Sequence, residues 1–199
     1  MKRYVGIDLS ATTGFVIQDA QGNIIIEDEF YYKTNEDPAR MNYITSKVID
    51  LINPETDIVG IEGFSHGSQS SSHDFQYGIG WIMREKLYLK GFEYWWNIAP
   101  TQVKKFATSN SYAKKDIVQK SVEKRWGYYH GSDNITDAFV MSEIVKAIHQ
   151  GDEYGTLKKH EKEVVKAIVK GKLNTTLIKE TKLPSWQNPN SKYYFTREK

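Results

Sequence analysis

Three acidic residues that lie far apart in the chain have the types and settings of metal ligands. Asp8 and Glu62 each stand near the end of a short apolar run, and Asp137 lies early in a long apolar-patterned segment. A charged carboxylate at the end of a buried strand costs on the order of several kcal/mol if it has no partner. A metal ion, a cationic side chain or protonation relieves that cost. Taken singly, each acid could equally be an ordinary turn or cap residue.

A fourth acid, Asp133, precedes Asp137 by four residues, so the two share one face of a helix. Asp133 has a competing role as the N-cap of that helix. Four carboxylates at one edge of a sheet repel one another unless divalent cations hold them. Oxygen ligands without cysteine favour Mg²⁺, for which Mn²⁺ can substitute. Two such ions about 3.5–4 Å apart would activate a water and stabilise the leaving oxygen in phosphodiester hydrolysis.

The first half of the chain predicts the elements that would position Asp8. Residues 3–15 begin with a strand that carries Asp8, and a small polar segment lets the chain turn into a second strand over residues 15–19. A turn-rich linker over residues 19–23 leads to a third strand over residues 24–31. These three strands predict an antiparallel meander.

Helices and strands alternate after the meander. Asp37 and Pro38 predict a helix start, as an N-cap followed by proline at the first helical position. Strands are predicted over residues 57–61 and 92–98, and helices over residues 74–89, 101–107, 114–126 and 132–150. This order predicts an α/β, ribonuclease-H-like mixed five-stranded sheet flanked by helices over residues 1–150. Residues 151–199 form a C-terminal extension, with a lysine-rich helix over residues 158–172 and a tail.

Basic side chains gather in two adjacent segments, where they could hold a phosphate backbone. They are Lys104, Lys105, Lys114, Lys115, Lys120, Lys124 and Arg125. A solvated helix face would look the same. Phe64, two residues after Glu62, could stack on an unpaired base or plug the core. His66 and His73 lie in a Ser-rich loop, where a general base is possible but surface decoration is the usual role.

Composition narrows the class of protein. The 199-residue chain carries a net charge of +2, 13% aromatic residues and no cysteine. The charge alone does not argue for a polyanion partner, and disulfides and thiolate-bound zinc are excluded. No apolar run approaches the roughly 20 residues that span a membrane, and no signal-peptide pattern opens the chain. We therefore expect a cytoplasmic protein without a membrane partner.

Five segments of the chain together resemble the RuvC-type Holliday junction resolvases, the crossover junction endodeoxyribonucleases, particularly the small phage-encoded kind. The matching segments are GIDLSATTGF near the start, IEGF at residues 61–64, APTQVKKF at 99–106, YAKKDIV at 112–118 and DNITDAF at 133–139. They span about three quarters of the chain.

The resemblance implies a homodimeric, Mg²⁺- or Mn²⁺-dependent endonuclease of DNA recombination and repair, in the host cytoplasm if phage-encoded. Its substrates would be four-way junctions, three-way junctions and replication forks. By this similarity Asp8, Glu62 and Asp137 are metal ligands, and Phe64 stacks on a base at the branch point. Lys115, or in its place Lys114, stabilises charge on the scissile phosphate.

The chain departs from the family pattern at two places. Where the family has Asp or His three residues before the last Asp, this chain has Asn134, so that either Asn134 or Asp133 completes the metal site. Ser109 and Ser111 stand where family members often have glycine. The Gly78–Ile79–Gly80 step favours close helix packing, consistent with a dimer interface over residues 74–89.

Three other readings compete. An actin/Hsp70-like nucleotide-binding domain starts similarly but would need a second such domain and another phosphate-binding glycine loop. A non-catalytic branched-DNA-binding module could keep the fold, although it would not need Asp8, Glu62 and Asp137. A related nuclease of this fold could act on RNA–DNA hybrids.

Overall fold

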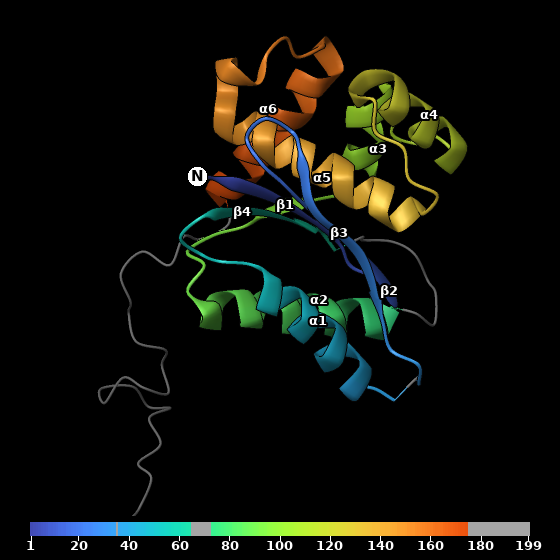
Figure 1. The fold of residues 1–199 in the computed structure, drawn as a ribbon, viewed down its shortest axis with the longest axis vertical. Coiled ribbons are helices and arrows are strands. Elements are labelled where there is room, and N and C mark those ends of the chain that lie inside the picture. Colours follow the sequence, from blue (N-terminus) through green and yellow to red (C-terminus); the bar gives the residue numbers. More distant parts are fainter. Residues whose placement is uncertain (35, 65–72, 175–199) are drawn as a thin grey trace, which may run out of the picture.

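A single mixed sheet organises the part of the chain that the computed structural model describes, residues 1–34, 36–64 and 73–174 (Figure 1). Its strands are β1 (Arg3–Asp8), β2 (Thr12–Gln18), β3 (Ile24–Tyr31), β4 (Asp57–Glu62) and β5 (Trp96–Ile98), in the order β3-β2-β1-β4-β5. β1 is antiparallel to β2 and parallel to β4, and β2 is antiparallel to β3. The predicted meander and the α/β, ribonuclease-H-like class are therefore confirmed.

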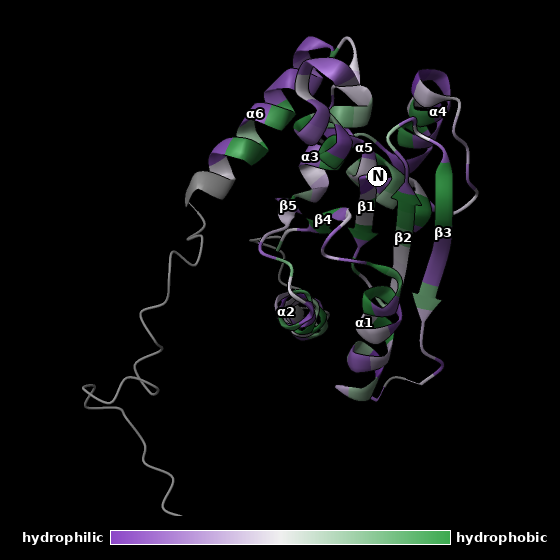
Figure 2. Cartoon of the chain, turned by 60° about the vertical axis from the view of Figure 1, so that its left-hand side comes forward, coloured by the Kyte–Doolittle hydropathy of each residue, from purple (hydrophilic) through white to green (hydrophobic). Residues whose placement is uncertain are grey.

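Helices cover both faces of the sheet (Figures 1 and 2). They are α1 (Ala39–Leu51), α2 (His73–Lys90), α3 (Pro100–Thr108), α4 (Lys115–Trp126), α5 (Asp133–Gln150), the 3₁₀ helix η1 (Gly151–Tyr154) and α6 (Lys159–Asn174). α1 and α2 lie on one face, and α3 to α6 lie on the other. None of these described helices is both long and apolar enough to cross a membrane.

Alternation along β1 decides which way Asp8 faces. Val5 and Ile7 are fully buried in the core beneath α1 and α2, whereas Tyr4 belongs to the core beneath α5. Successive side chains of a strand point to opposite faces. Asp8, four residues after Tyr4, therefore points to the α5 side of the sheet, which is the side from which Asp137 approaches.

Two glycines let α5 lie directly on the strands. A Cβ atom added at Gly6 would come within 1.9 Å of the Ala138 carbonyl oxygen, and one added at Gly14 within 2.1 Å of the Asn134 carbonyl oxygen. Real side chains do not tolerate such distances, so only glycine permits this crossing. The close contact places the first turns of α5 against the carboxyl end of β1.

Several predicted boundaries differ from the structure. β2 begins at Thr12, before the predicted residue 15, because Thr12 and Thr13 already pair with β3. The predicted strand over residues 92–98 is wrong for its first half: the Phe92 amide donates to the Leu87 carbonyl at 3.0 Å and closes the end of α2. Only Trp96–Ile98 pairs with β4.

The predicted N-cap at Asp37 is also wrong. Pro38 occupies the cap position and α1 begins at Ala39, with no side-chain cap bond. Asp37 instead pairs at 2.8 Å with Arg40, the second residue of the helix. An ion pair with a nearby guanidinium thus replaces the hydrogen bond that an N-cap carboxylate would accept from the helix start.

The glycines of α2 pack within the chain. A Cβ at Gly78 would lie 2.7 Å from the Met41 sulfur of α1, and one at Gly80 would lie 2.5 Å from the Phe64 ring. Close packing around these glycines is therefore accounted for by intrachain contacts, and it no longer argues for a dimer interface.

Candidate active site

Three predicted acids line the same cavity. Two of them stand at the carboxyl ends of parallel strands, and the third stands near the start of a helix. β1 and β4 run parallel and end at Asp8 and Glu62. α5 crosses β1 and presents Asp137 from its second turn. All three side chains line a cavity of about 230 Å³, together with Asp133 and Asn134. Residues separated by more than a hundred positions are thus neighbours, as the order of the elements predicted.

The three acids perturb one another electrostatically. Burial raises the pKa of Asp8 well above its usual range, and the charges of Glu62 and Asp137 raise it further. Burial, followed by the charge of Asp137, raises the pKa of Glu62 to about 7. Burial likewise raises the pKa of Asp137 to about 6, against an opposing effect of Lys104. A cavity that holds protons this tightly is one in which additional positive charge is stabilised.

Asp133 and Asn134 both line the cavity, and each has a different partner. Ser132, and not Asp133, is the N-cap of α5 and accepts from the Ile135 amide at 3.4 Å. Asp133 is therefore free of the capping role and pairs with Lys115 at 2.9 Å. The Asn134 amide nitrogen donates to Glu29 of β3 at 2.9 Å, and the Ser132 hydroxyl also donates to Glu29.

Arg84 of α2 is a residue that the sequence reasoning missed. Arg84 is 7% exposed, and its guanidinium donates to the Glu62 carbonyl at 3.0 Å and to the Asn97 side chain at 2.8 Å. It thereby ties the end of β4 to β5, and its charge opposes the rise in the Glu62 pKa. One feature of the sequence could have indicated this role. Arg84 is a basic residue among apolar ones on a predicted helix, and it follows by four residues a glycine, Gly80, that leaves room for it.

Two of the predicted basic residues reach the acidic cavity. Lys104 of α3 and Lys115, the first residue of α4, both line it. Lys114 is the exposed residue just before α4, and Lys120 is exposed further along that helix. Lys105 does not line the cavity and instead pairs with Glu163 of α6 at 2.8 Å.

Phe64 lies in an aromatic cluster beside the end of β4. Its ring is half-buried and lies 5.1 Å from Tyr77 and 5.3 Å from Trp81, both on α2. The Arg84 guanidinium covers the same ring at 4.2 Å. Phe64 thus packs within the chain while part of its ring remains accessible. His66 lies outside the described residues, and His73 begins α2.

The donor chemistry of the cavity fits a hard divalent cation, because its candidate ligands are carboxylate and amide oxygens. As the side chains stand, no three His, Cys, Asp or Glu residues among those described are close enough to hold an ion. The shared cavity and raised pKa values of Asp8, Glu62 and Asp137 show that they are near enough to act on one another.

Comparison with known proteins finds likeness in structure alone. Neither a family model nor a curated protein matches this chain. The fold is similar to that of Thermus thermophilus RuvC, with 17% sequence identity and a TM-score of 0.57, covering 75% of this chain and 95% of that one. It is equally similar to T. thermophilus RuvC in complex with a Holliday junction substrate, at 17% identity and a TM-score of 0.57, covering 71% of this chain and 91% of that one. The chain therefore has the RuvC-like, ribonuclease-H-like fold.

Proposed function

We propose that this chain is a metal-dependent endonuclease that cleaves Holliday junctions and other branched DNA. The observation that carries the proposal is the convergence of Asp8, Glu62 and Asp137 in one cavity with Lys104 and Lys115 at its wall. Acids that repel one another would be stabilised by bound cations, and the neighbouring lysines would bind a phosphate. The similarity to a structure of RuvC bound to a Holliday junction substrate supports DNA as the substrate.

Two divalent cations, Mg²⁺ or Mn²⁺, would be held by Asp8, Glu62 and Asp137, with Asp133 or Asn134 completing the set. Such ions activate water and stabilise the leaving oxygen of a phosphodiester. Of the two completing candidates, Asp133 supplies charge, and it becomes available when Lys115 moves to a phosphate. Asn134 is held in place by Glu29 and would contribute a neutral oxygen.

The basic residues of α3 and α4 would hold the DNA strand. Lys104 and Lys115 are within the cavity wall, so they would contact the scissile phosphate and its neighbour. Lys114 and Lys120 are exposed and would bind phosphates further away, which makes binding strongly salt-dependent. Lys105 would join them only if its ion pair with Glu163 opened. Phe64 would stack on an unpaired base at the branch point.

A homodimer would place two such sites on two strands, as symmetric cleavage of a four-way junction requires. The α2 glycines pack against residues of the same chain, so they do not support a dimer. Support for a dimer comes instead from large apolar side chains on that helix. Trp81 is 63% exposed, Tyr88 59% and Leu89 72%. Exposed apolar residues that gather on one helix are typical of a surface that meets a partner.

The test is cleavage of labelled four-way, three-way and linear duplex DNA with Mg²⁺, with Mn²⁺ and with EDTA. We expect nicks near the branch point that need the metal and are absent on linear duplex. Tight junction binding without cutting would instead indicate a non-catalytic DNA-binding module. ATP hydrolysis without DNA binding would indicate a nucleotide-binding domain of the actin type.

A further inference from the structure

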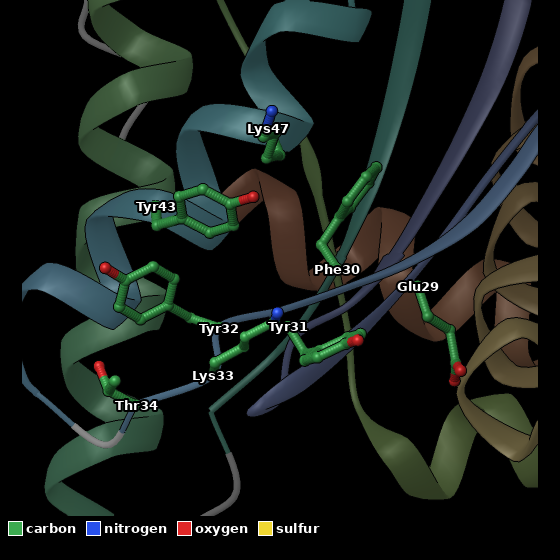
Figure 3. A pocket seen from close by; sticks show the side chains of 8 residues that line it. All are labelled: Glu29, Phe30, Tyr31, Tyr32, Lys33, Thr34, Tyr43 and Lys47. Atoms are coloured by element: carbon green, nitrogen blue, oxygen red, sulfur yellow. The ribbon is translucent and has the colours of Figure 1, made fainter.

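A second cavity, larger than the acidic one, lies where β3 ends beside α1. Its volume is about 620 Å³, and it is lined by Glu29, Phe30, Tyr31, Tyr32, Lys33, Thr34, Tyr43 and Lys47 (Figure 3). None of these residues has a part in the function proposed above except Glu29, which anchors α5. The composition of the cavity is aromatic and basic, in contrast to the acidic site.

Three tyrosines present their rings to solvent here. Tyr31 is 59% exposed, Tyr32 36% and Tyr43 41%. The rings of Tyr32 and Tyr43 lie 4.8 Å apart and are inclined at 41°. Tyr32 directly follows β3 and Tyr43 lies in the first half of α1, so the packed sheet and helix hold this pair in place (Figure 3).

Two lysines flank the rings. Lys33 and Lys47 are exposed, and within the described residues neither is within salt-bridge distance of a carboxylate. The Lys47 ammonium lies 5.5 Å from the centre of the Tyr43 ring. The acid that lines the cavity, Glu29, has its carboxylate turned toward Ser132 and Asn134 on α5. Figure 3 shows it on the far side of the strand from Tyr32 and Tyr43.

The register of the sheet places this surface at the catalytic edge. Asp8 pairs with Gly14, Gly14 pairs with Glu29, and Tyr31 pairs with Thr12. Neighbouring strands are about 4.8 Å apart, so β3 lies roughly 10 Å from β1 across the sheet. Asp8 faces the α5 side of the sheet and Tyr43 stands on α1, on the other side, so a strand that leaves the acidic cavity would reach the tyrosines by passing around this edge of the sheet.

We propose that Tyr32 and Tyr43, with Lys33 and Lys47, bind unpaired nucleotides of the DNA strand that adjoins the branch point. Aromatic rings accept the faces of unstacked bases whatever their sequence, and the lysines match the phosphates between them. The bases of paired DNA are stacked on one another, so paired DNA would contact only the lysines, through its phosphates. The inference rests on the proposed function for its substrate and deepens it, since it selects branched DNA with a single-stranded arm over a fully paired junction.

The experiment compares a fork carrying a single-stranded arm, a fully paired four-way junction and an unpaired oligonucleotide of the arm sequence, with binding measured by fluorescence anisotropy. The variants are Tyr43→Leu and the double change Tyr32→Leu with Tyr43→Leu. The matched control is Tyr94→Leu, because Tyr94 is 40% exposed and precedes β5 at the opposite end of the sheet.

We expect the double variant to bind the fork and the oligonucleotide at least about tenfold more weakly, the loss associated with one stacked base. Affinity for the paired junction should stay within twofold of wild type, and Tyr94→Leu should change nothing. Separately, Lys47→Gln should reduce the slope of log K against log salt by about one on the fork.

Four results separate this inference from the proposed function. Equal losses on fork and paired junction, or no loss, overturn the inference while the nuclease proposal stands. Loss by Tyr94→Leu to the same extent overturns it as well. Wild type that binds the fork and the oligonucleotide through these tyrosines but cuts no branched DNA with either metal overturns the nuclease proposal alone. No binding to any of the three DNA molecules overturns both and leaves the surface to a protein partner.

Discussion

At the scale of single residues, the acidic cavity is set by unfavourable interactions that the fold imposes. Burial is the largest cause of the raised pKa values of Asp8, Glu62 and Asp137; the charges of Glu62 and Asp137 add to it at Asp8, and the charge of Asp137 adds to it at Glu62. Arg84, Lys104 and Lys115 offset part of this cost. Bound cations would remove the rest of this cost. The electrostatic cost of holding the three acids together is therefore what would give the site its affinity for metal.

Asp8→Asn should separate binding from cutting. The change removes one ligand charge, so we expect cleavage to fall by more than about a hundredfold, the loss seen when even the partners of a metal ligand are removed. Junction binding should remain, because the lysines that hold phosphates are untouched. The exposed Asp50 on α1 provides the control Asp50→Asn. Loss of binding together with cutting would mean that Asp8 serves folding.

The raised pKa of Glu62 predicts how stability depends on pH. The pKa rises from 4.5 in the unfolded chain to about 7 in the fold, so the folded state binds more protons within that window. The contribution of Glu62 to the stability of the metal-free protein should therefore be fully present below pH 4.5. It should be lost as the pH rises through about 7. The loss is on the order of 3 kcal/mol.

Urea unfolding in EDTA at pH 5 and pH 8, for wild type and Glu62→Gln, measures this loss. Glu62→Gln cannot ionise and should lose less stability over the interval, whereas Glu123→Gln, at an exposed position of α4, should behave like wild type. Identical pH dependence in wild type and Glu62→Gln would rule out burial of a charged Glu62 as the cause.

At the scale of elements, α5 is the part on which the site depends. It lies against the sheet through Gly6 and Gly14, and its first turn is tied to β3 by Glu29. These contacts decide where Asp137 stands relative to Asp8. Neither contact involves the side chains of Asp8, Glu62 or Asp137, yet a change in either should affect the site.

Glu29→Ala should weaken both stability and cleavage. It leaves the Ser132 hydroxyl and the Asn134 amide without their acceptor, which costs about 1–3 kcal/mol. Glu27→Ala is the control, because Glu27 stands on the same strand and accepts from Tyr128 at 2.6 Å, away from the acidic cavity. Thermal unfolding and junction cleavage should separate the two variants. Equal cleavage by both would remove Glu29 from the positioning of α5.

Gly6→Ala should be far more damaging than its size suggests. Its Cβ would meet the Ala138 carbonyl oxygen at 1.9 Å, and backbone on both sides leaves little to adjust. We expect a loss of about 3 kcal/mol or more in unfolding free energy. At Gly131 an added Cβ meets nothing within 4 Å, so Gly131→Ala should be nearly neutral when measured by the same urea titration.

The elements that carry the acids could be predicted because their signals are local. Apolar runs ending at Asp8 and Glu62, and the polar start of α5 before Asp137, gave their positions and order. Glu29 and Arg84 could not be predicted, because each acts on residues that the fold alone brings near. The overlong prediction for β5 arose from the aromatic residues before Trp96, of which Phe92 closes the end of α2 and none pairs with β4.

At the scale of the whole molecule, α6 is packed into the same core as the sheet. Val164 and Ile168 are buried with residues of α3, α4 and α5, and Glu161 is 1% exposed and pairs with Arg125 at 3.2 Å. The lysine-rich helix predicted as part of an extension therefore has a face that packs into the core. Residues 159–174 should unfold together with the sheet.

Two valines of α6 test this packing with the same chemical change. Val164 is 2% exposed and Val169 is 37% exposed. Val164→Ala should cost about 2 kcal/mol through lost burial and the cavity left behind, whereas Val169→Ala should stay within about 0.5 kcal/mol of wild type. Urea unfolding gives both values. Two separate transitions, with Val164→Ala affecting only one, would show that α6 unfolds independently.

The crossing of β1 by α5 also determines when a growing chain can first act. Asp137 leaves the ribosome about 130 residues after Asp8, on the order of ten seconds later at ordinary rates of synthesis. Until α5 is made, the sheet face over Gly6 and Gly14 is bare and the carboxylates lack their third member. Under the proposed function, a nascent chain is thus inert toward DNA, and its nuclease activity starts only when α5 docks.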